Sequence, residues 1–361
     1  MNDGEEKTMN IRILEAPKTI CSNPHGIHRY FAWPSVTRLQ DGSLAAVASG
    51  FRLAHVCPFG KVVLFRSYDE GASWTAPEVI LDTPLDDRDG GICTFGDSGV
   101  VVTSFNNDVS FQRRFAKDSP YRTAYLDAVE ATGNYRDYLG STMVISHDGG
   151  KTFGDPILCP ISSPHGPCTL ADGTVLYVGR LFHDDGSQPH LECRVLHPDG
   201  STSLRSRIAD VGENLLSCEP HAIQLPSGRI VVHIRVQDDQ KKHFTVYQSV
   251  SDDLGYTFTP PVPLLADKGG SPPHLLLHSS GVLVSVYGYR EKPYGIRVMF
   301  SRDDGETWDT DNVLLDEEPS ADLGYPASAE LRDGRILTVF YTRENAEGDS
   351  VIRQVIWSFE P

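Results

Sequence analysis

Hydrophobic and polar residues alternate in short runs along most of the chain, and turn-forming residues separate the runs. The stretches KVVLFRS (61–67) and IRVMFS (296–301) are examples. A two-residue period over runs of this length predicts β-strands with one buried face. Residues 110–138 depart from the pattern, because they are charged and aromatic without alternation, and we expect a short helix there.

The strands come in repeated units. Each unit has a strand, a turn that ends in glycine, and an alternating apolar strand. The turn glycines are Gly42, Gly99, Gly173, Gly228, Gly281 and Gly334. Spacings of 53 to 74 residues leave room for four strands in each unit. Six such units predict an all-β fold, a six-bladed β-propeller of four-stranded antiparallel blades.

The repeats also predict the domain organisation. We expect a single propeller domain over residues 1–361, with an insertion at about 108–140 in the second unit. Little chain follows the last hairpin, so a strand near IRILEA (11–16) is expected to complete the last blade and close the ring.

A second repeat lies between these units. Its four copies are SYDEGASW (67–74), SHDGGKTF (146–153), SDDLGYTF (251–258) and SRDDGETW (301–308), and HPDGSTS (197–203) looks like a degraded copy. The aspartate can accept backbone N–H bonds in a tight turn, and the glycine can take a positive φ angle. We therefore expect Asp69, Asp148, Asp253 and Asp303 to be structural residues of outer hairpins.

Composition narrows the possible partners. The formal net charge is −17, from 49 acidic and 32 basic residues. Nucleic acids and anionic membranes need a basic surface, so neither is expected as a partner, although local arginines can still bind a small anion. The N-terminal residues are polar and lack a secretory apolar segment, and we expect a cytoplasmic protein. No pattern bears on the oligomeric state.

Cysteine and histidine spacing bears on cofactors. The seven cysteines are scattered and form no Cys-x-x-Cys pair, which favours reduced, buried thiols over a disulfide framework. No short spacing of histidine, cysteine and glutamate recurs. We expect neither a metal nor another cofactor.

The turn boxes resemble the Asp-box, or BNR, repeat of the sialidase superfamily, and the resemblance covers nearly the whole chain. It implies one active site at the centre of the ring, with three arginines around a substrate carboxylate, a Tyr–Glu nucleophile pair and an aspartate acid/base. GYPASAELRDGRILTVFY (324–341) is similar to the stretch with the catalytic tyrosine, which implies Tyr325. CEPHAIQLPSGRIVVHIR (218–235) implies Glu219 as its partner and Arg235 as a carboxylate ligand.

These residue types suit the implied chemistry. A phenol with a pKa of about 10 is a poor nucleophile at neutral pH, and a neighbouring carboxylate can take its proton during attack. A guanidinium group binds a carboxylate through two parallel hydrogen bonds. The strand before the last box offers Arg297 as a second carboxylate ligand, with Arg290 as the alternative.

The first blade departs from the family pattern at two places. Ala32-Trp33-Pro34 stands where the family has roughly Arg-Ile-Pro, and Arg29 or Arg52 is the expected replacement for the arginine. The loop after the first hairpin contains no aspartate, and His55 is the most plausible acid/base there because its ordinary pKa suits proton transfer.

Further candidates complete the expected site. Asp89 and Asp87 are alternative acid/base residues, and Arg88 beside them is a candidate substrate ligand. His165 and His221 are expected to contact the substrate, and Asp322 to orient Tyr325 or cap its loop.

The expected function is an exo-glycosidase of sialidase type that acts on a terminal acidic sugar, so the partner is a carbohydrate with a carboxylate. Two alternatives stay open. Histidines near the ends of the predicted strands also fit a polysaccharide lyase or rhamnosidase-like propeller that uses a histidine acid/base. They are His25, His28, His55, His165 and His221. The third possibility is a glycan-binding propeller without catalysis.

Overall fold

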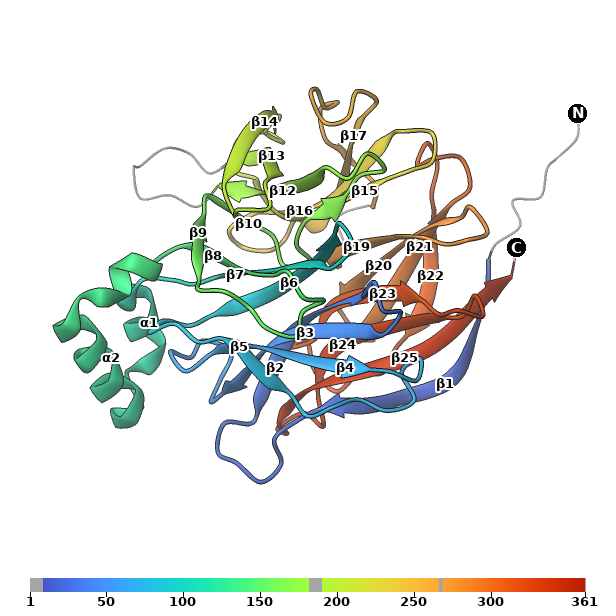
Figure 1. The fold of residues 1–361 in the computed structure, drawn as a ribbon. Coiled ribbons are helices and arrows are strands. Elements are labelled where there is room, and N and C mark those ends of the chain that lie inside the picture. The colour runs from blue at the N-terminus through green and yellow to red at the C-terminus, as the bar shows by residue number, and fades with distance from the viewer. Residues whose placement is uncertain (1–8, 182–189, 266–268, 361) are drawn as a thin grey trace, which may run out of the picture.

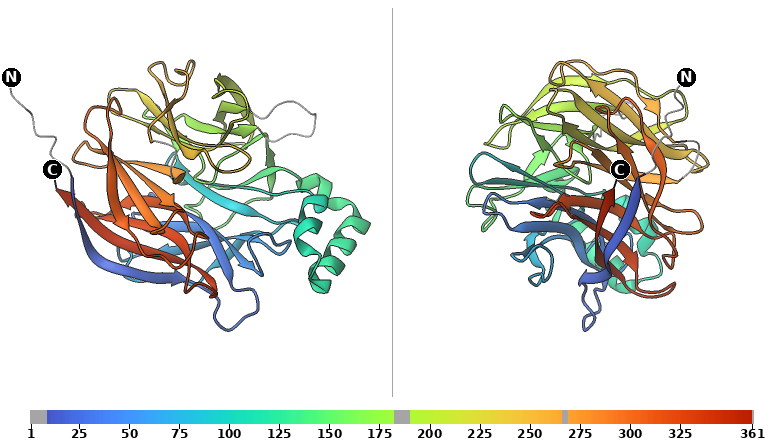
Figure 2. Two further views of the ribbon diagram at one scale, coloured as in Figure 1. Left: turned by 180° about the vertical axis from the view of Figure 1, so that it is seen from behind. Right: turned by 90° about the vertical axis from the view of Figure 1, so that its right-hand side faces the viewer.

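Six antiparallel sheets make up most of the molecule (Figure 1). The computed structural model describes residues 9–181, 190–265 and 269–360. In the right-hand view of Figure 2 the sheets follow one another around a ring in chain order. The predicted six-bladed β-propeller is therefore confirmed.

The first three blades occupy the N-terminal half. Blade 1 contains β2 (Tyr30–Arg38), β3 (Leu44–Arg52), β4 (Lys61–Ser67) and β5 (Glu78–Leu81). Blade 2 contains β6 (Arg88–Phe95), β7 (Gly99–Phe105), β8 (Ser141–Ser146) and β9 (Ile157–Cys159). Blade 3 contains β10 (Ile161–Ser162), β11 (Cys168–Thr169), β12 (Val175–Leu181), β13 (Leu191–Leu196) and β14 (Thr202–Ile208). Its inner strand is split, since β10 and β11 both pair with β12.

The last three blades close the ring. Blade 4 contains β15 (Leu216–Gln224), β16 (Ile230–Gln237), β17 (Phe244–Ser251) and β18 (Val262–Pro263). Blade 5 contains β19 (Gly270–Leu277), β20 (Leu283–Tyr289), β21 (Gly295–Ser301) and β22 (Asp309–Leu315). Blade 6 contains β23 (Gly324–Glu330), β24 (Ile336–Arg343), β25 (Ser350–Glu360) and the N-terminal β1 (Asn10–Cys21). The pairing of β1 with β25 joins the two ends of the chain in one blade.

Two helices interrupt blade 2 between β7 and β8. They are α1 (Val109–Ala116) and α2 (Pro120–Thr132), and a 3₁₀ turn (Asn134–Tyr138) follows. Asp108 caps α1 and Ser119 caps α2 through their side chains. The helices project at the end of the molecule opposite both termini (Figures 1 and 2). Within the described residues neither helix has the length and apolar character needed to cross a bilayer.

The four turn boxes share one hydrogen-bond pattern. In the first, Asp69 accepts bonds from the backbone N–H and hydroxyl of Ser73, and the Ser67 hydroxyl accepts from Gly71 N–H. The other three boxes repeat these bonds. A Cβ at Gly71 would lie 2.3 Å from Leu337 of the adjacent blade. The first box therefore lies close against the adjacent blade.

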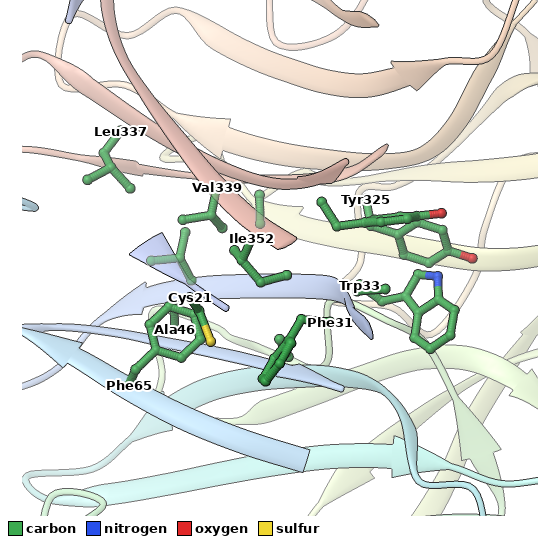
Figure 3. Packing of buried hydrophobic residues seen from close by; sticks show 14 of the residues in the cluster. Cys21, Phe31, Trp33, Ala46, Phe65, Tyr325, Leu337, Val339 and Ile352 are labelled. Atoms are coloured by element: carbon green, nitrogen blue, oxygen red, sulfur yellow. The ribbon is translucent and has the colours of Figure 1, made fainter. Parts of the chain in front are cut away.

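Apolar side chains fill the spaces between blades. The cluster between blades 6 and 1 carries Trp33 and Tyr325 at one end (Figure 3), where their ring centroids are 6.3 Å apart. All seven cysteines are free thiols, and only Cys168 is not buried. The candidate site residues at the starts of the inner strands therefore border the packed hydrophobic core.

Candidate active site

The inner strands of four blades carry the same backbone distortion. The residues concerned are Trp33 (φ 55°), Asp89 (φ 50°), Glu219 (φ 50°) and Tyr325 (φ 49°). Left-handed φ angles are uncommon for residues other than glycine. Each residue precedes a proline or glycine, and each such pair lies opposite a single residue of the next strand, which defines a β-bulge. Bulges often redirect side chains next to active sites.

The bulges gather residues that are distant in sequence. Tyr325 Oη donates a 2.8 Å hydrogen bond to Glu219 Oε1, across 106 residues. Arg235 Nη1 donates to Glu219 Oε2 at 2.6 Å and lies 3.5 Å from Tyr325 Oη. The structure therefore brings the expected phenol, carboxylate and guanidinium groups together in one cluster.

Burial and neighbouring charge set the protonation of this cluster. Burial raises the pKa of Tyr325 well above its ordinary value, and the charges of Glu219 and Asp89 raise it further. Burial alone would raise the pKa of Glu219, but the charge and hydrogen bond of Arg235 outweigh it, and the pKa is lowered. At neutral pH the phenol is neutral and Glu219 is ionised, as a base for the phenol must be.

Arg290 adds a cation that no carboxylate in the described part of the chain neutralises. Its Nε donates to the Leu323 carbonyl at 3.0 Å and its Nη2 to Tyr341 Oη at 3.2 Å. Its guanidinium carbon lies 5.7 Å from the centre of the Tyr325 ring. A half-buried guanidinium group with only neutral partners beside the reactive pair is suited to an anionic ligand.

Ala32 stands at the place of the missing first-blade arginine, and the next residue, Trp33, contacts two other arginines. The guanidinium carbon of Arg88 lies 4.1 Å from the indole, and that of Arg52 lies 4.7 Å from it. Arg52 is fully buried and forms a 2.5 Å ion pair with the equally buried Asp86, whose other oxygen lies 3.4 Å from Arg88. Arg52 is thus neutralised by Asp86, whereas Arg88 shares that carboxylate and stacks on the indole.

His55 lies at the rim and is 48% exposed. Its Nδ1 is 2.8 Å from Tyr30 Oη and 3.3 Å from Asp322 Oδ1. The Tyr30 hydroxyl donates to Asp322, so Nδ1 carries the proton of the neutral ring and Nε2 is the basic atom. Partial burial lowers the pKa of His55, and the positive charges of Arg88 and Arg52 lower it further. The hydrogen bond and charge of Asp322 raise the pKa, but the net shift is downward. His55 is therefore a neutral base at neutral pH.

Asp89 has the opposite character. It is buried, and its Oδ1 has no hydrogen-bond partner among the described residues. Burial raises its pKa to about 7, with a further contribution from the charge of Glu219, against the opposing effect of Arg88. A carboxyl group that keeps its proton near neutral pH can donate it, so burial and the surrounding charges favour Asp89 as an acid.

Sequence comparison agrees with the repeats. A family model described as "BNR repeat-like domain" matches residues 128–338, more than half of the chain. The chain belongs to the BNR repeat-like family. This confirms the resemblance found in the turn boxes. A search of curated proteins finds no match.

Solved structures share the fold of this BNR repeat-like protein. A protein of unknown function from Dyadobacter fermentans is 20% identical, with a TM-score of 0.78 over 97% of this chain and 99% of that one. A Trypanosoma rangeli sialidase in complex with sialic acid is 15% identical, with a TM-score of 0.62 over 96% and 58% of the two chains. A Penicillium chrysogenum α-L-arabinanase complexed with arabinobiose is 14% identical, with a TM-score of 0.63 over 96% and 98%. At these identities the likeness shows the fold alone.

Two arginines expected from the sequence lie outside the cluster. Arg297 donates to the carbonyls of Ile296, Leu315 and Pro293 and stacks on Tyr289. It belongs to the third strand of blade 5 and donates to backbone carbonyls there, whereas Arg290 lies beside the Tyr325 ring. Arg29 is exposed, and it donates to the Gly26 carbonyl.

The expected histidine contacts lie deeper than the bulges. His165, His221 and His274 form a layer, with ring centroids 5.6, 5.1 and 4.3 Å apart. Burial lowers the pKa of all three rings, so they are neutral. They line a cavity of about 340 Å³ that extends to Arg38 and Glu330. His165 and His221 therefore form a floor, with the His165 ring 6.5 Å from that of Tyr325.

Asp322 and Asp87 have different partners from those expected. Asp322 accepts hydrogen bonds from Tyr30, Tyr341 and Arg343, and the structure gives it no bond to Tyr325. It therefore orients the groups that surround the phenol. Asp87 accepts bonds from the backbone N–H and hydroxyl of Thr83, which makes it a buried turn residue.

The sequence reasoning missed several site residues, namely Tyr30, Asp86, Lys241, Tyr341 and Arg343. One signal was available: Arg235 and Tyr341 each pair with the residue before a bulge, Cys218 and Gly324. Aligning the second strands of the repeats would have put both in the same register. The exposed Lys241 stands in a loop, where partial burial and the charges of Arg235 and Arg290 lower its pKa.

The buried Arg52–Asp86 pair generates a stability prediction. Asp86→Asn leaves Arg52 buried without a counter-charge, so we expect the free energy of unfolding to fall by about 3–5 kcal/mol. Urea unfolding at pH 7 measures it. The control Asp82→Asn removes only the partly exposed pair with Lys61 and should cost about 0–1 kcal/mol. Equal, small losses in both variants would contradict this account of Asp86.

Asp89 should make stability depend on pH. Its pKa is about 7 in the folded protein against a model-peptide value of 3.8, so the folded state binds more protons between these pH values. The contribution of Asp89 to stability therefore falls as pH rises from about 4 through 7. We expect Asp89→Asn to stabilise the protein more at pH 8 than at pH 5, as measured by urea unfolding at both. A difference between wild type and variant that does not change with pH would argue against the raised pKa.

Proposed function

We propose that the protein is an exo-glycosidase of sialidase type, which hydrolyses a terminal acidic sugar such as sialic acid. The observation that carries the proposal is the Tyr325–Glu219–Arg235 cluster, a neutral phenol hydrogen-bonded to an ionised carboxylate that an arginine holds. The sialic acid complex of the Trypanosoma rangeli sialidase supports it as a structural relative.

Local charge supports an anionic substrate. The cluster pairs Arg52 with Asp86, Arg235 with Glu219 and Arg343 with Asp322. Arg290 remains without a carboxylate partner in the described structure, and Arg88 shares Asp86 with Arg52. With Asp89 protonated, the site carries excess positive charge in a protein of net charge −17. The substrate carboxylate would bind Arg290 and Arg235, with Arg88 as a third cation.

The reaction would proceed by double displacement. Tyr325 Oη attacks the anomeric carbon while Glu219 takes the phenol proton, and the bond to the leaving oxygen breaks as Asp89 protonates that oxygen. Water then cleaves the tyrosyl–sugar bond as Asp89 takes a proton from the water and Glu219 returns its proton to the departing Tyr325 Oη. A neutral phenol approaches an anionic sugar without the repulsion that a carboxylate nucleophile would meet. Two inversions give overall retention of configuration.

Asp89 suits the acid role better than His55. His55 is neutral at neutral pH, and a neutral imidazole with its Nδ1 proton held toward Tyr30 and Asp322 offers only a lone pair at Nε2. Asp89 retains a transferable proton in the same pH range.

The basic Nε2 of His55 also favours a second candidate function, a lyase that abstracts a proton beside the carboxylate of a uronic acid residue. A lyase leaves an unsaturated uronate that absorbs in the near ultraviolet, whereas hydrolysis does not. Product spectra from uronate-containing glycans therefore separate the two reactions. Binding without turnover over a broad glycan panel would indicate a non-catalytic propeller instead.

Tyr325→Phe tests the proposal. It removes the nucleophilic oxygen and keeps the ring, so we expect kcat on aryl glycosides of sialic or uronic acids to fall by at least about a thousandfold. Steady-state assays of the released aryl alcohol measure it. Tyr256→Phe, a tyrosine that is 61% exposed in a turn box, is the matched control and should keep wild-type rates. An unchanged rate in Tyr325→Phe would remove the phenol from the mechanism.

A further inference from the structure

A group of aromatic side chains joins the loop that follows His55 to the helical insertion. Phe59 lies in the loop between β3 and β4, four residues after His55. Its ring stacks on Tyr121 of α2, with centroids 4.9 Å apart and planes at 28°, and lies 4.7 Å from Tyr125. His28 meets Phe59 edge-on at 5.3 Å. We call these four residues, His28, Phe59, Tyr121 and Tyr125, the aromatic platform.

Tyr125 joins the platform to the core of the helices, whereas Tyr121 is not part of that core. The buried cluster that includes Leu126 and Leu85 holds α2 on the propeller, and Tyr125 packs against it. Tyr121 remains 57% exposed, and Phe59 is only half-buried. Exposed aromatic surface that is contiguous and rigid is typical of ligand sites.

Hydrogen bonds fix the platform relative to the candidate active site. Arg122 of α2 donates to the Val56 carbonyl at 3.0 Å, and Tyr125 Oη donates to the Pro84 carbonyl at 3.2 Å. Gln112 of α1 donates at 3.1 Å to Asp86, the carboxylate that holds Arg52. The helices therefore act as a fixed wall beside the His55 loop.

The His55 loop is fixed in the same way. Arg52 and Arg88 both donate to the His55 carbonyl, at 2.8 and 2.9 Å. Four residues of extended chain span at most about 14 Å, so Phe59 lies within that distance of His55, measured between Cα atoms. The His55 ring lies 5.1 Å from that of Trp33, which lies 6.3 Å from that of Tyr325, so an oligosaccharide with its terminal residue at the cluster can extend past His55 toward the platform.

We propose that the aromatic platform is a second sugar subsite, which binds by stacking the uncharged sugar residue linked to the terminal acidic sugar. The faces of the platform rings are apolar, and the C–H face of a pyranose is complementary to them. The proposal rests on the proposed function, because it takes the terminal sugar to lie at the Tyr325–Glu219 cluster. Its consequence is a preference for oligosaccharides over short glycosides.

Binding to the Tyr325→Phe protein tests the subsite without turnover. The probes are 3′-sialyllactose, free sialic acid and lactose, titrated by calorimetry. In this background Tyr121→Ala should weaken 3′-sialyllactose about tenfold, as the loss of one aromatic contact implies, and leave the Kd of free sialic acid unchanged. Phe115→Ala is the matched control, an aromatic residue 49% exposed on α1 whose ring partner is Phe111, and should change neither Kd.

The outcomes separate the two proposals. An unchanged Kd for 3′-sialyllactose in Tyr121→Ala, or an equal loss in Phe115→Ala, overturns the subsite while binding of free sialic acid still supports the central site. Equal weakening of free sialic acid and 3′-sialyllactose by Tyr121→Ala also overturns it. If free sialic acid does not bind but lactose binds in a manner that depends on Tyr121, the platform is a sugar site and the proposed function fails.

Discussion

The bulge at the mouth of the inner strands is the constraint on which the site depends. In a regular strand the side chains alternate between the two faces of a blade, so none would point into the central cluster. At Trp33, Asp89, Glu219 and Tyr325 the backbone takes a left-handed φ angle, which costs of the order of 1–3 kcal/mol for each residue. The packed propeller compensates for this strain, and each bulge supplies one side chain to the cluster.

The second requirement is charge balance. The cluster contains several buried or half-buried arginines, and a buried guanidinium group is stable only when it is paired and hydrogen-bonded. Asp86 forms the ion pair with Arg52, and it also accepts a hydrogen bond from Gln112 of α1. The arrangement of Arg88, the His55 loop and the helical wall therefore depends on a single carboxylate. Arg290 is the exception, because its hydrogen-bond partners are the neutral Leu323 carbonyl and Tyr341 hydroxyl.

The sequence predicted the architecture well, because each turn box and each hairpin repeats a local pattern with a local physical cause. Tyr325, Glu219 and Arg235 were implied by the resemblance of residues 324–341 and 218–235 to sialidase stretches, and their side chains meet in the structure. Arg290 and Arg297 could not be separated, because the choice depends on which strand of blade 5 carries each and on what packs there. His165 and His221 resembled rim residues, but both are buried against each other's rings, which depends on how blades 3 and 4 pack.

Covalent trapping tests the central claim most directly. The protein would be incubated with activated fluorinated sialic and uronic acid glycosides, which slow the breakdown of a covalent intermediate, and digested for peptide mass spectrometry. The account predicts one sugar adduct per chain, on Tyr325. An adduct on Glu219, Asp89 or another residue, or turnover of a substrate in the panel while Tyr325 stays unmodified, would contradict it.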